Sequence, residues 1–239
     1  ISHYKMAIKI KPDYADAHYN LGIALVAEGK NEEAISHYKM AIKIKPDYVE
    51  AYSNLGNALV AEGKNEEAIS HYKMAIKLNP DLASAYNNLG HLLSETGNTR
   101  EAISNLRKAV NLVPEFALAY WNLGNVLMAE KENKEAISHY KTAIELDPDS
   151  AQGHFTLGNA LMAEKENKEA ILHYRTALKL KPGWADAYFN TGVALQKEGN
   201  TREAIFYYKM AIKVNPDFPE VYNNLGFFLL EEGNTNEAI

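Results

Sequence analysis

The chain has 239 residues, 46% of them hydrophobic, and a net charge of −6, which together allow a sizeable apolar core. The negative charge argues against nucleic-acid binding, and no apolar run is long enough to span a bilayer. The absence of cysteine excludes disulfides and thiolate chemistry, and it leaves the compartment open.

A 34-residue period runs through the chain from its first residues. Residues 1–14 are identical to residues 35–48, and glycine and alanine series keep the same step as the prolines. The proline series is Pro12, Pro46, Pro80, Pro114, Pro148, Pro182 and Pro216. Three residue types in one period predict an array of repeats.

Each repeat is predicted to form two helices. In 15–48 the first helix covers about 15–28 and ends at Gly29, a residue suited to a left-handed turn. Asn31 is the expected N-cap of the second helix, and Pro46 cannot continue that helix.

The turns between the two helices differ along the chain. Thr99, Thr201 and Thr235 are expected to take the N-cap role of Asn31. Lys131 and Lys165 stand where the other turns have glycine, so we expect a left-handed or reshaped backbone there.

The period divides the chain into a single array of repeats. The second helix of a preceding repeat (1–14) comes first and a partial repeat (219–239) last. Between them lie six full repeats, 15–48, 49–82, 83–116, 117–150, 151–184 and 185–218.

The recurring residues resemble the tetratricopeptide repeat (TPR) along the whole chain. In the first full repeat they are His18, Leu21, Gly22, Leu25, Ala34, Tyr38, Ala41 and Pro46. Leu106 and Thr191 are small departures from the pattern. The resemblance implies an all-α fold, a right-handed superhelical α-solenoid of stacked helix-turn-helix repeats, with a partner held on its concave face.

Asparagine recurs at the sixth position of the first helices, on the face turned away from the core positions. The series is Asn20, Asn54, Asn88, Asn122, Asn190 and Asn224, and position nine adds Asn57, Asn125 and Asn159. This column resembles the asparagine ladder of O-linked N-acetylglucosamine transferase, which implies that it holds the backbone amides of a peptide. The alternative is that these amides only satisfy neighbouring helices.

Aromatic residues occupy position five in three consecutive repeats, as Trp121, Phe155 and Phe189. They are either exposed anchors for apolar side chains of a ligand or rings that pack against the next helix. Position five has no lysine, which separates this chain from family members that grip acidic carboxyl tails. With acidic residues at position two, such as Asp16 and Glu50, the face favours a neutral or basic segment.

Seven of the eight histidines fall at repeat positions, and none is paired at the spacing of a zinc helix. There is also no phosphate-binding glycine loop and no nucleophile with a plausible base. We therefore predict no metal, no cofactor and no catalysis.

The predicted function is a protein-interaction scaffold that binds a peptide segment of a partner. One alternative is the substrate-recognition arm of a larger glycosyltransferase. Another is a self-assembling scaffold, because the chain begins and ends inside predicted helices whose exposed edges are able to stack.

Overall fold

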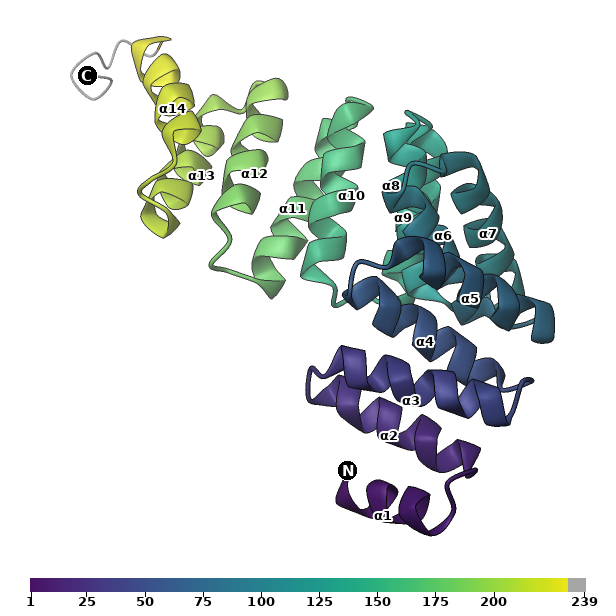
Figure 1. Cartoon of the computed structure of the whole chain (residues 1–239). Helices are drawn as coiled ribbons and strands as arrows, with labels where there is room; N and C mark the ends of the chain where they lie inside the picture. Colours follow the sequence, from purple (N-terminus) through teal and green to yellow (C-terminus); the bar gives the residue numbers. More distant parts are fainter. Residues whose placement is uncertain (232–239) are drawn as a thin grey trace. The chain divides into compact units, whose positions relative to one another are not determined.

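The computed structural model describes residues 1–231, with side chains described through Phe227. Within this range the chain forms fourteen α-helices and is otherwise turns (Figure 1). Their bounds are α1 Ser2–Ile10, α2 Ala15–Ala27, α3 Asn31–Ile44, α4 Val49–Ala61, α5 Asn65–Leu78, α6 Ala83–Glu95, α7 Thr99–Leu112, α8 Ala117–Ala129, α9 Asn133–Leu146, α10 Ala151–Ala163, α11 Asn167–Leu180, α12 Ala185–Lys197, α13 Thr201–Val214 and α14 Pro219–Glu231. The predicted all-α solenoid of paired helices is confirmed.

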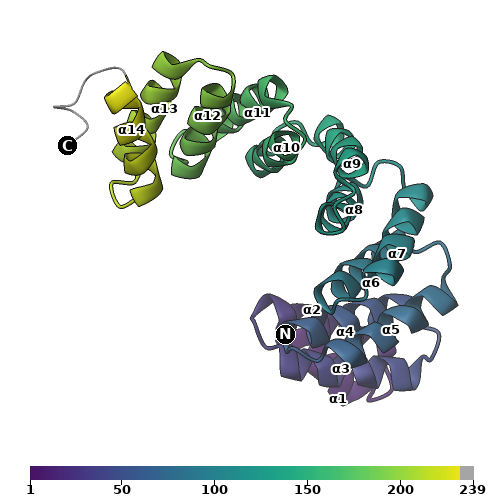
Figure 2. The same cartoon turned by 90° about the horizontal axis from the view of Figure 1, so that it is seen from above.

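Contacts between helices divide the chain into two compact units, Ile1–Asn122 and Leu123–Ile239, with the boundary inside α8. In the first unit, α2 packs on α3, α4 on α5 and α6 on α7, and each pair also contacts the next. In the second unit, α10 packs on α11 and α12 on α13. Figure 2 shows the first helices α10, α12 and α14 in one layer and the second helices α11 and α13 in the other.

The turn between the two helices of a repeat contains one residue with a positive φ. Gly29 has φ +74°, and the equivalent Gly63, Gly97 and Gly199 are similar. Lys131 and Lys165 adopt φ of 64° and 63°, so these two turns keep the shape of the others at the cost of a left-handed lysine. Of the two outcomes expected for these lysines, the left-handed backbone is the one that the structure has, and the turns are not reshaped.

The predicted N-caps are wrong by one residue. Asn31, Thr99 and Thr201 are already the first residues of their helices. The residues before them occupy the N-cap position, and their side chains make no capping hydrogen bond. Gly29, which has the positive φ, is followed directly by Lys30, and Lys30 occupies the N-cap position of α3. The predicted cap at Thr235 lies outside the described residues.

The core of each repeat is built around one close approach between its two helices. A Cβ placed on Gly56 would lie 2.5 Å from Cε1 of Tyr72, so α4 and α5 meet only because position eight has no side chain. The same glycine and tyrosine meet at Gly22, Gly124, Gly158 and Gly192. Fully buried leucines and alanines, such as Leu55 and Ala68, fill the space around this contact.

We expect Gly56→Ala to destabilise the protein by about 1–3 kcal/mol, because the added methyl group overpacks against the Tyr72 ring. Urea unfolding followed by circular dichroism measures the change. Ser70→Ala, on the exposed side of α5, is the control and is expected to change stability by less than about 0.5 kcal/mol. Equal stability of Gly56→Ala and the wild type would contradict the proposed close approach.

We expect Lys131→Gly and Lys165→Gly to stabilise the protein, each by about 0.5–1 kcal/mol, because glycine adopts a positive φ without strain. The reverse change, Gly63→Lys, occupies the equivalent turn and is expected to destabilise by a similar amount. Thermal unfolding of the three variants beside the wild type measures both signs. A loss of stability in the two glycine variants would show that the lysines make compensating contacts.

Candidate functional site

Three clefts open between successive first helices, each bounded by side chains at the same repeat positions. The first cleft lies between 15–48 and 49–82, the second between 49–82 and 83–116, and the third between 151–184 and 185–218. Their volumes are about 190, 370 and 190 Å³. The recurring lining residues are Ile23, Val26, Tyr38, Asn54 and Asn57; Asn57, Val60, Tyr72, Asn88 and His91; and Asn159, Met162, Tyr174, Asn190 and Val193.

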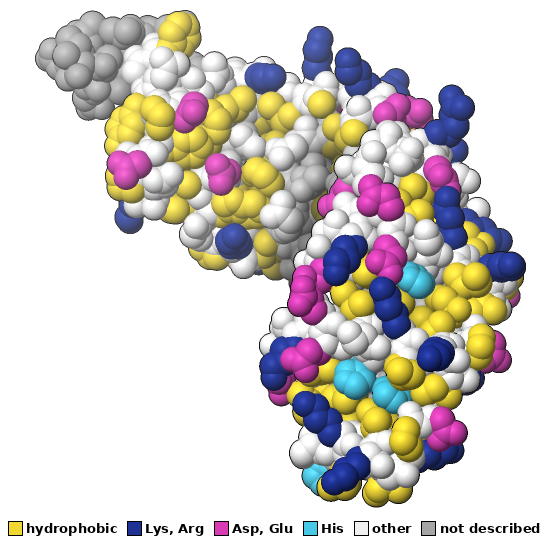
Figure 3. Space-filling model, in the orientation of Figure 1, with side chains coloured by type: hydrophobic (Ala, Val, Ile, Leu, Met, Phe, Trp, Pro, Cys, Tyr) yellow, Lys and Arg dark blue, Asp and Glu magenta, His cyan; other side chains and the backbone are white. Residues whose placement is uncertain are grey.

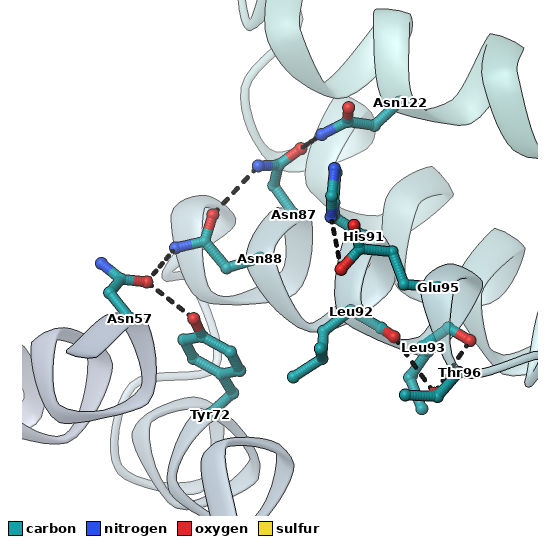
Figure 4. A network of polar contacts seen from close by, with 10 residues as sticks. All are labelled: Asn57, Tyr72, Asn87, Asn88, His91, Leu92, Leu93, Glu95, Thr96 and Asn122. Carbon is teal, nitrogen blue, oxygen red and sulfur yellow. Dashed lines mark hydrogen bonds and ion pairs between the residues drawn. The ribbon is translucent and has the colours of Figure 1, made fainter. Parts of the chain in front are cut away.

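In the second cleft, amide side chains from three repeats form one hydrogen-bonded row (Figure 4). Asn57 Oδ1 accepts from the Tyr72 hydroxyl at 2.7 Å and from Asn88 Nδ2 at 3.0 Å. Asn88 Oδ1 then accepts from Asn87 Nδ2 at 3.1 Å, and Asn87 Oδ1 from Asn122 Nδ2 at 2.8 Å. The row therefore ties each first helix to the next.

The third cleft repeats the central part of this arrangement. Asn159 Oδ1 accepts from the Tyr174 hydroxyl at 2.8 Å and from Asn190 Nδ2 at 3.0 Å. Burial raises the pKa of Tyr72 and of Tyr174, so both hydroxyls stay protonated and remain donors.

The side-chain amides of Asn57 and Asn159 each keep hydrogen-bonding groups that no other described residue uses. A carbonyl oxygen has two lone pairs, and in Asn57 and Asn159 both are used by the tyrosine hydroxyl and the next asparagine. Within the described part of the chain, the Nδ2 groups of these two residues have no hydrogen-bond partner. Each amide thus offers two N–H donors, and no acceptor, to a molecule in the cleft.

The other predicted asparagines serve their neighbours in different ways. Asn54 donates to the Tyr19 hydroxyl at 3.0 Å, and Asn125 accepts from the Tyr140 hydroxyl at 2.7 Å. Asn122 is only 6% exposed. Asn20 is half-buried, and Asn224 is half-buried beside the Tyr208 hydroxyl.

The aromatic residues at position five are half-buried and contact other rings. Phe155 lies 4.4 Å from Trp184 and 5.8 Å from Tyr174 between ring centroids, and Phe189 packs in the same way with Phe218 and Tyr208. Trp121 is half-buried and has contacts of its own. Figure 3 shows hydrophobic side chains gathered over α12–α14, with single charged side chains between them.

Several cleft residues were not predicted from the sequence. Leu118 is 53% exposed at the rim of the second cleft, where Nδ1 of His91 lies 3.7 Å from Oε2 of Glu95. Asn87 links two ladder residues, although its position varies in type along the repeats. The sequence did carry one signal for the bond between the tyrosine hydroxyl and the amide at position nine. Asparagine occurs at position nine only in repeats with tyrosine at position twenty-four, whereas the repeat with Leu106 has His91.

Two pairs of histidines pack between the helices of their repeats. His18 Nε2 lies 3.0 Å from the Pro12 carbonyl, so it carries the proton, and His18 Nδ1 accepts from His37 Nδ1 at 3.0 Å. His154 and His173 repeat this geometry at 2.9 Å. Among the described residues, no group of three or more histidine or carboxylate side chains could hold a metal ion.

Burial is the main cause that lowers the pKa of His37, His71 and His173. Neighbouring groups modify this effect. The pKa of His37 is lowered further by His18 and Lys5 and raised by Glu33. The pKa of His71 is raised by Glu67 and lowered by Lys39. The pKa of His173 is lowered by His154 and Lys141 and raised by Glu169.

Because the pKa of each of these histidines is lowered, we expect the free energy of unfolding to decrease as the pH falls from about 7.5 to 5.5. The unfolded chain binds protons near the ordinary histidine pKa of about 6.5, whereas the folded chain resists them. Stability is therefore complete above that pKa and is lost as the pH falls toward the lowered folded values. The depressed pKa of Glu67 and of Glu169 acts only below about pH 4.5, outside this window.

Urea unfolding at the two pH values measures the loss. The triple variant His37→Asn, His71→Asn, His173→Asn uses the residue found at the equivalent Asn105, and its stability should depend less on pH. His91→Asn, in which the altered side chain is exposed, is the control. An unchanged pH dependence in the triple variant would exclude these rings as its source.

None of the helices in the described range is long and apolar enough to cross a bilayer.

Family models together match the whole chain. A model described as TPR repeat matches 1–29, 24–61, 56–97, 92–131, 124–164 and 158–199, and models described as tetratricopeptide repeat match 185–218 and 207–239. No curated protein sequence matches the chain.

Solved structures show the same fold. The chain is similar to YrrB, described as a TPR protein with an unusual peptide-binding site, at 26% identity and a TM-score of 0.71, over 78% of this chain and 96% of YrrB. It is similar to MamA at 30% identity and a TM-score of 0.65, over 68% of this chain and 95% of MamA. PilF of Pseudomonas aeruginosa shares the fold at 22% identity and a TM-score of 0.74, over 87% of this chain and 95% of PilF. The 34-residue period, the helix pairs and the matching repeat models show that the chain belongs to the tetratricopeptide repeat family, whose domains generally mediate protein–protein interactions.

Proposed function

We propose that this protein is a non-catalytic interaction scaffold that binds an extended peptide segment along its first helices. Within each compact unit the segment lies across a cleft, where its backbone carbonyl groups accept hydrogen bonds from the side-chain amide of Asn57 in the first unit or of Asn159 in the second. Because backbone carbonyls are present at every residue, this contact does not depend on the peptide sequence.

The observation that carries the proposal is that the N–H donors of Asn57 and Asn159 are not used by the residues that the structure describes, whereas their oxygens are. Their oxygens are filled from within the protein, and the remaining Nδ2 groups belong to residues that line the clefts. The rest of the lining is mostly apolar, with Val60, Leu92 and Met162 beside the amides. A donor beside an apolar hollow suits a peptide carbonyl next to an apolar side chain.

Charge favours a neutral or basic segment over an acidic one. Position two of the first helices is exposed and acidic at Asp16, Glu50 and Asp186, and Glu95 lines the second cleft. An acidic segment would meet like charges there. The peptide-binding site named for YrrB is consistent with this proposal, since that protein shares 26% identity and the fold with this chain.

The network makes a sharp test possible. In Asn57→Asp and Asn159→Asp, one carboxylate oxygen still accepts from the tyrosine and from the next asparagine. The free N–H donors are replaced by a second acceptor oxygen, and each exchange adds one negative charge. We expect the double variant to bind a peptide, selected on the wild type from a random library, at least about tenfold more weakly. Fluorescence anisotropy of the labelled peptide measures this affinity.

The control is Asn111→Asp, which makes the same chemical change on the exposed side of α7 and is expected to bind as the wild type does. Circular dichroism checks that all variants are folded. Wild-type affinity of the double variant for the selected peptide would refute recognition by these amides. The predictions that the chain is the arm of a glycosyltransferase or assembles with itself are separate, and this experiment does not bear on them.

A further inference from the structure

The side of the second helices that faces away from the first helices becomes more apolar between α9 and α11. Residues 129–140 and 163–174 differ at a single position, where Ser138 becomes Leu172. Likewise 99–103 and 201–205 are identical, and the next residue changes from serine to Phe206. Every earlier second helix has serine at this place, as Ser2, Ser36, Ser70, Ser104 and Ser138.

Both new side chains are exposed to solvent rather than drawn into the core. Leu172 is 63% and Phe206 57% exposed, so the larger residues do not fill a gap between helices. A single exposed apolar residue is ordinary on a protein surface, but two at equivalent places on successive helices of one layer form a patch.

Contacts between α11 and α13 make this patch continuous. Arg175 forms an ion pair with Glu203, and its guanidinium lies 5.9 Å from the centre of the Tyr207 ring. The Phe206 ring meets the Tyr207 ring edge to face, with centroids 5.5 Å apart. We call Leu172, Arg175, Phe206 and Tyr207 the outer patch.

The charges around the outer patch are mainly positive. Lys168 and Arg202 lie one turn before its apolar residues, and Lys179 and Lys213 two turns after them, all exposed. Lys168 reaches Glu198 only at 4.0 Å, and its side chain is 90% exposed. In the first two full repeats, acidic residues occupy the place of Lys168, as Glu32 and Glu66.

The carboxylates on the same side are already paired. Glu169 lies 2.8 Å from Lys141, and Glu203 is bound to Arg175. The patch therefore presents an apolar centre between two basic rows, one at each end of the helices.

We propose that the outer patch docks an acidic amphipathic helix of a partner protein. The apolar side of that helix covers Leu172 and Phe206, and its carboxylates pair with the flanking Lys168, Arg202 and Lys179. This surface is distinct from the clefts of the first helices and selects the opposite charge, so one chain can hold two different segments at once.

The probe is a synthetic amphipathic peptide of about 20 residues, with leucines on one helical face and glutamates on the other. We expect Leu172→Ser with Phe206→Ser to weaken its binding at least about tenfold. Lys168→Glu with Arg202→Glu should weaken it similarly, more strongly at low salt. All four exchanges use residue types that the structure carries on its exposed surface, so the fold is expected to persist.

Two controls separate this surface from others. Met40→Ser removes an apolar side chain that is 39% exposed on the outer face of α3, and Asn57→Asp with Asn159→Asp alters the clefts. Both variants should bind the probe as the wild type does, whatever the fate of the proposed peptide-binding function.

Four results would overturn the proposal. They are no binding of the probe by the wild type, unchanged affinity in the Leu172→Ser, Phe206→Ser variant, equal binding of a lysine counterpart of the probe, and binding of phosphatidylserine vesicles but not of the peptide. A dimer found by sedimentation that this variant abolishes would instead assign the patch to a second copy of the chain, and would equally refute an acidic partner helix.

Discussion

The contact between a glycine on the first helix and a tyrosine ring on the second determines how five of the six full repeats are built, and in the repeat 83–116 Leu106 takes the place of the ring. At Gly56 and Tyr72 the two helices are as close as a missing Cβ allows. The tyrosine then has no freedom to move away from the first helix, and its hydroxyl reaches position nine on the same repeat. The position of a polar atom at the surface is thus a consequence of packing in the core.

In this arrangement the structural role of the asparagines and their proposed contact with a peptide are compatible. Asn57 satisfies its neighbours through its oxygen, which is what a structural amide does. The same two bonds fix the side-chain orientation and leave its nitrogen available. A pre-oriented donor loses little conformational entropy on binding, which favours recognition of a flexible peptide backbone.

The repeat pattern made most of the fold predictable, because period, glycine, proline and alanine all report the same 34-residue unit. The repeat placed Lys131 and Lys165 at the glycine position of the turn, but the structure was needed to show that their backbone is left-handed and the turn not reshaped. The N-caps could not be predicted from the repeat, since they depend on whether the helix starts at Asn31 or one residue later, a difference of one hydrogen bond.

The site was predictable only as a set of positions. The column of asparagines was found from the sequence, but which amide oxygen bonds to which nitrogen depends on the side chains that meet across repeats. Asn88 reaches back to Asn57 and Asn122 reaches Asn87, so equivalent residues choose different partners. The choice follows the residue types at positions five and nine, and these vary from repeat to repeat.

The link from one repeat's amide to the next also bears on how such a chain can change in length. Asn88 bonds to Asn57 and Asn190 to Asn159, in each case 31 residues back. Duplication of a whole repeat that carries asparagine at positions six and nine keeps donor and acceptor 31 residues apart, whereas an insertion of any other size changes this spacing. Residues 27–43 and 61–77 are identical, as expected after such a duplication. A row of amides is therefore able to grow in evolution in steps of one repeat.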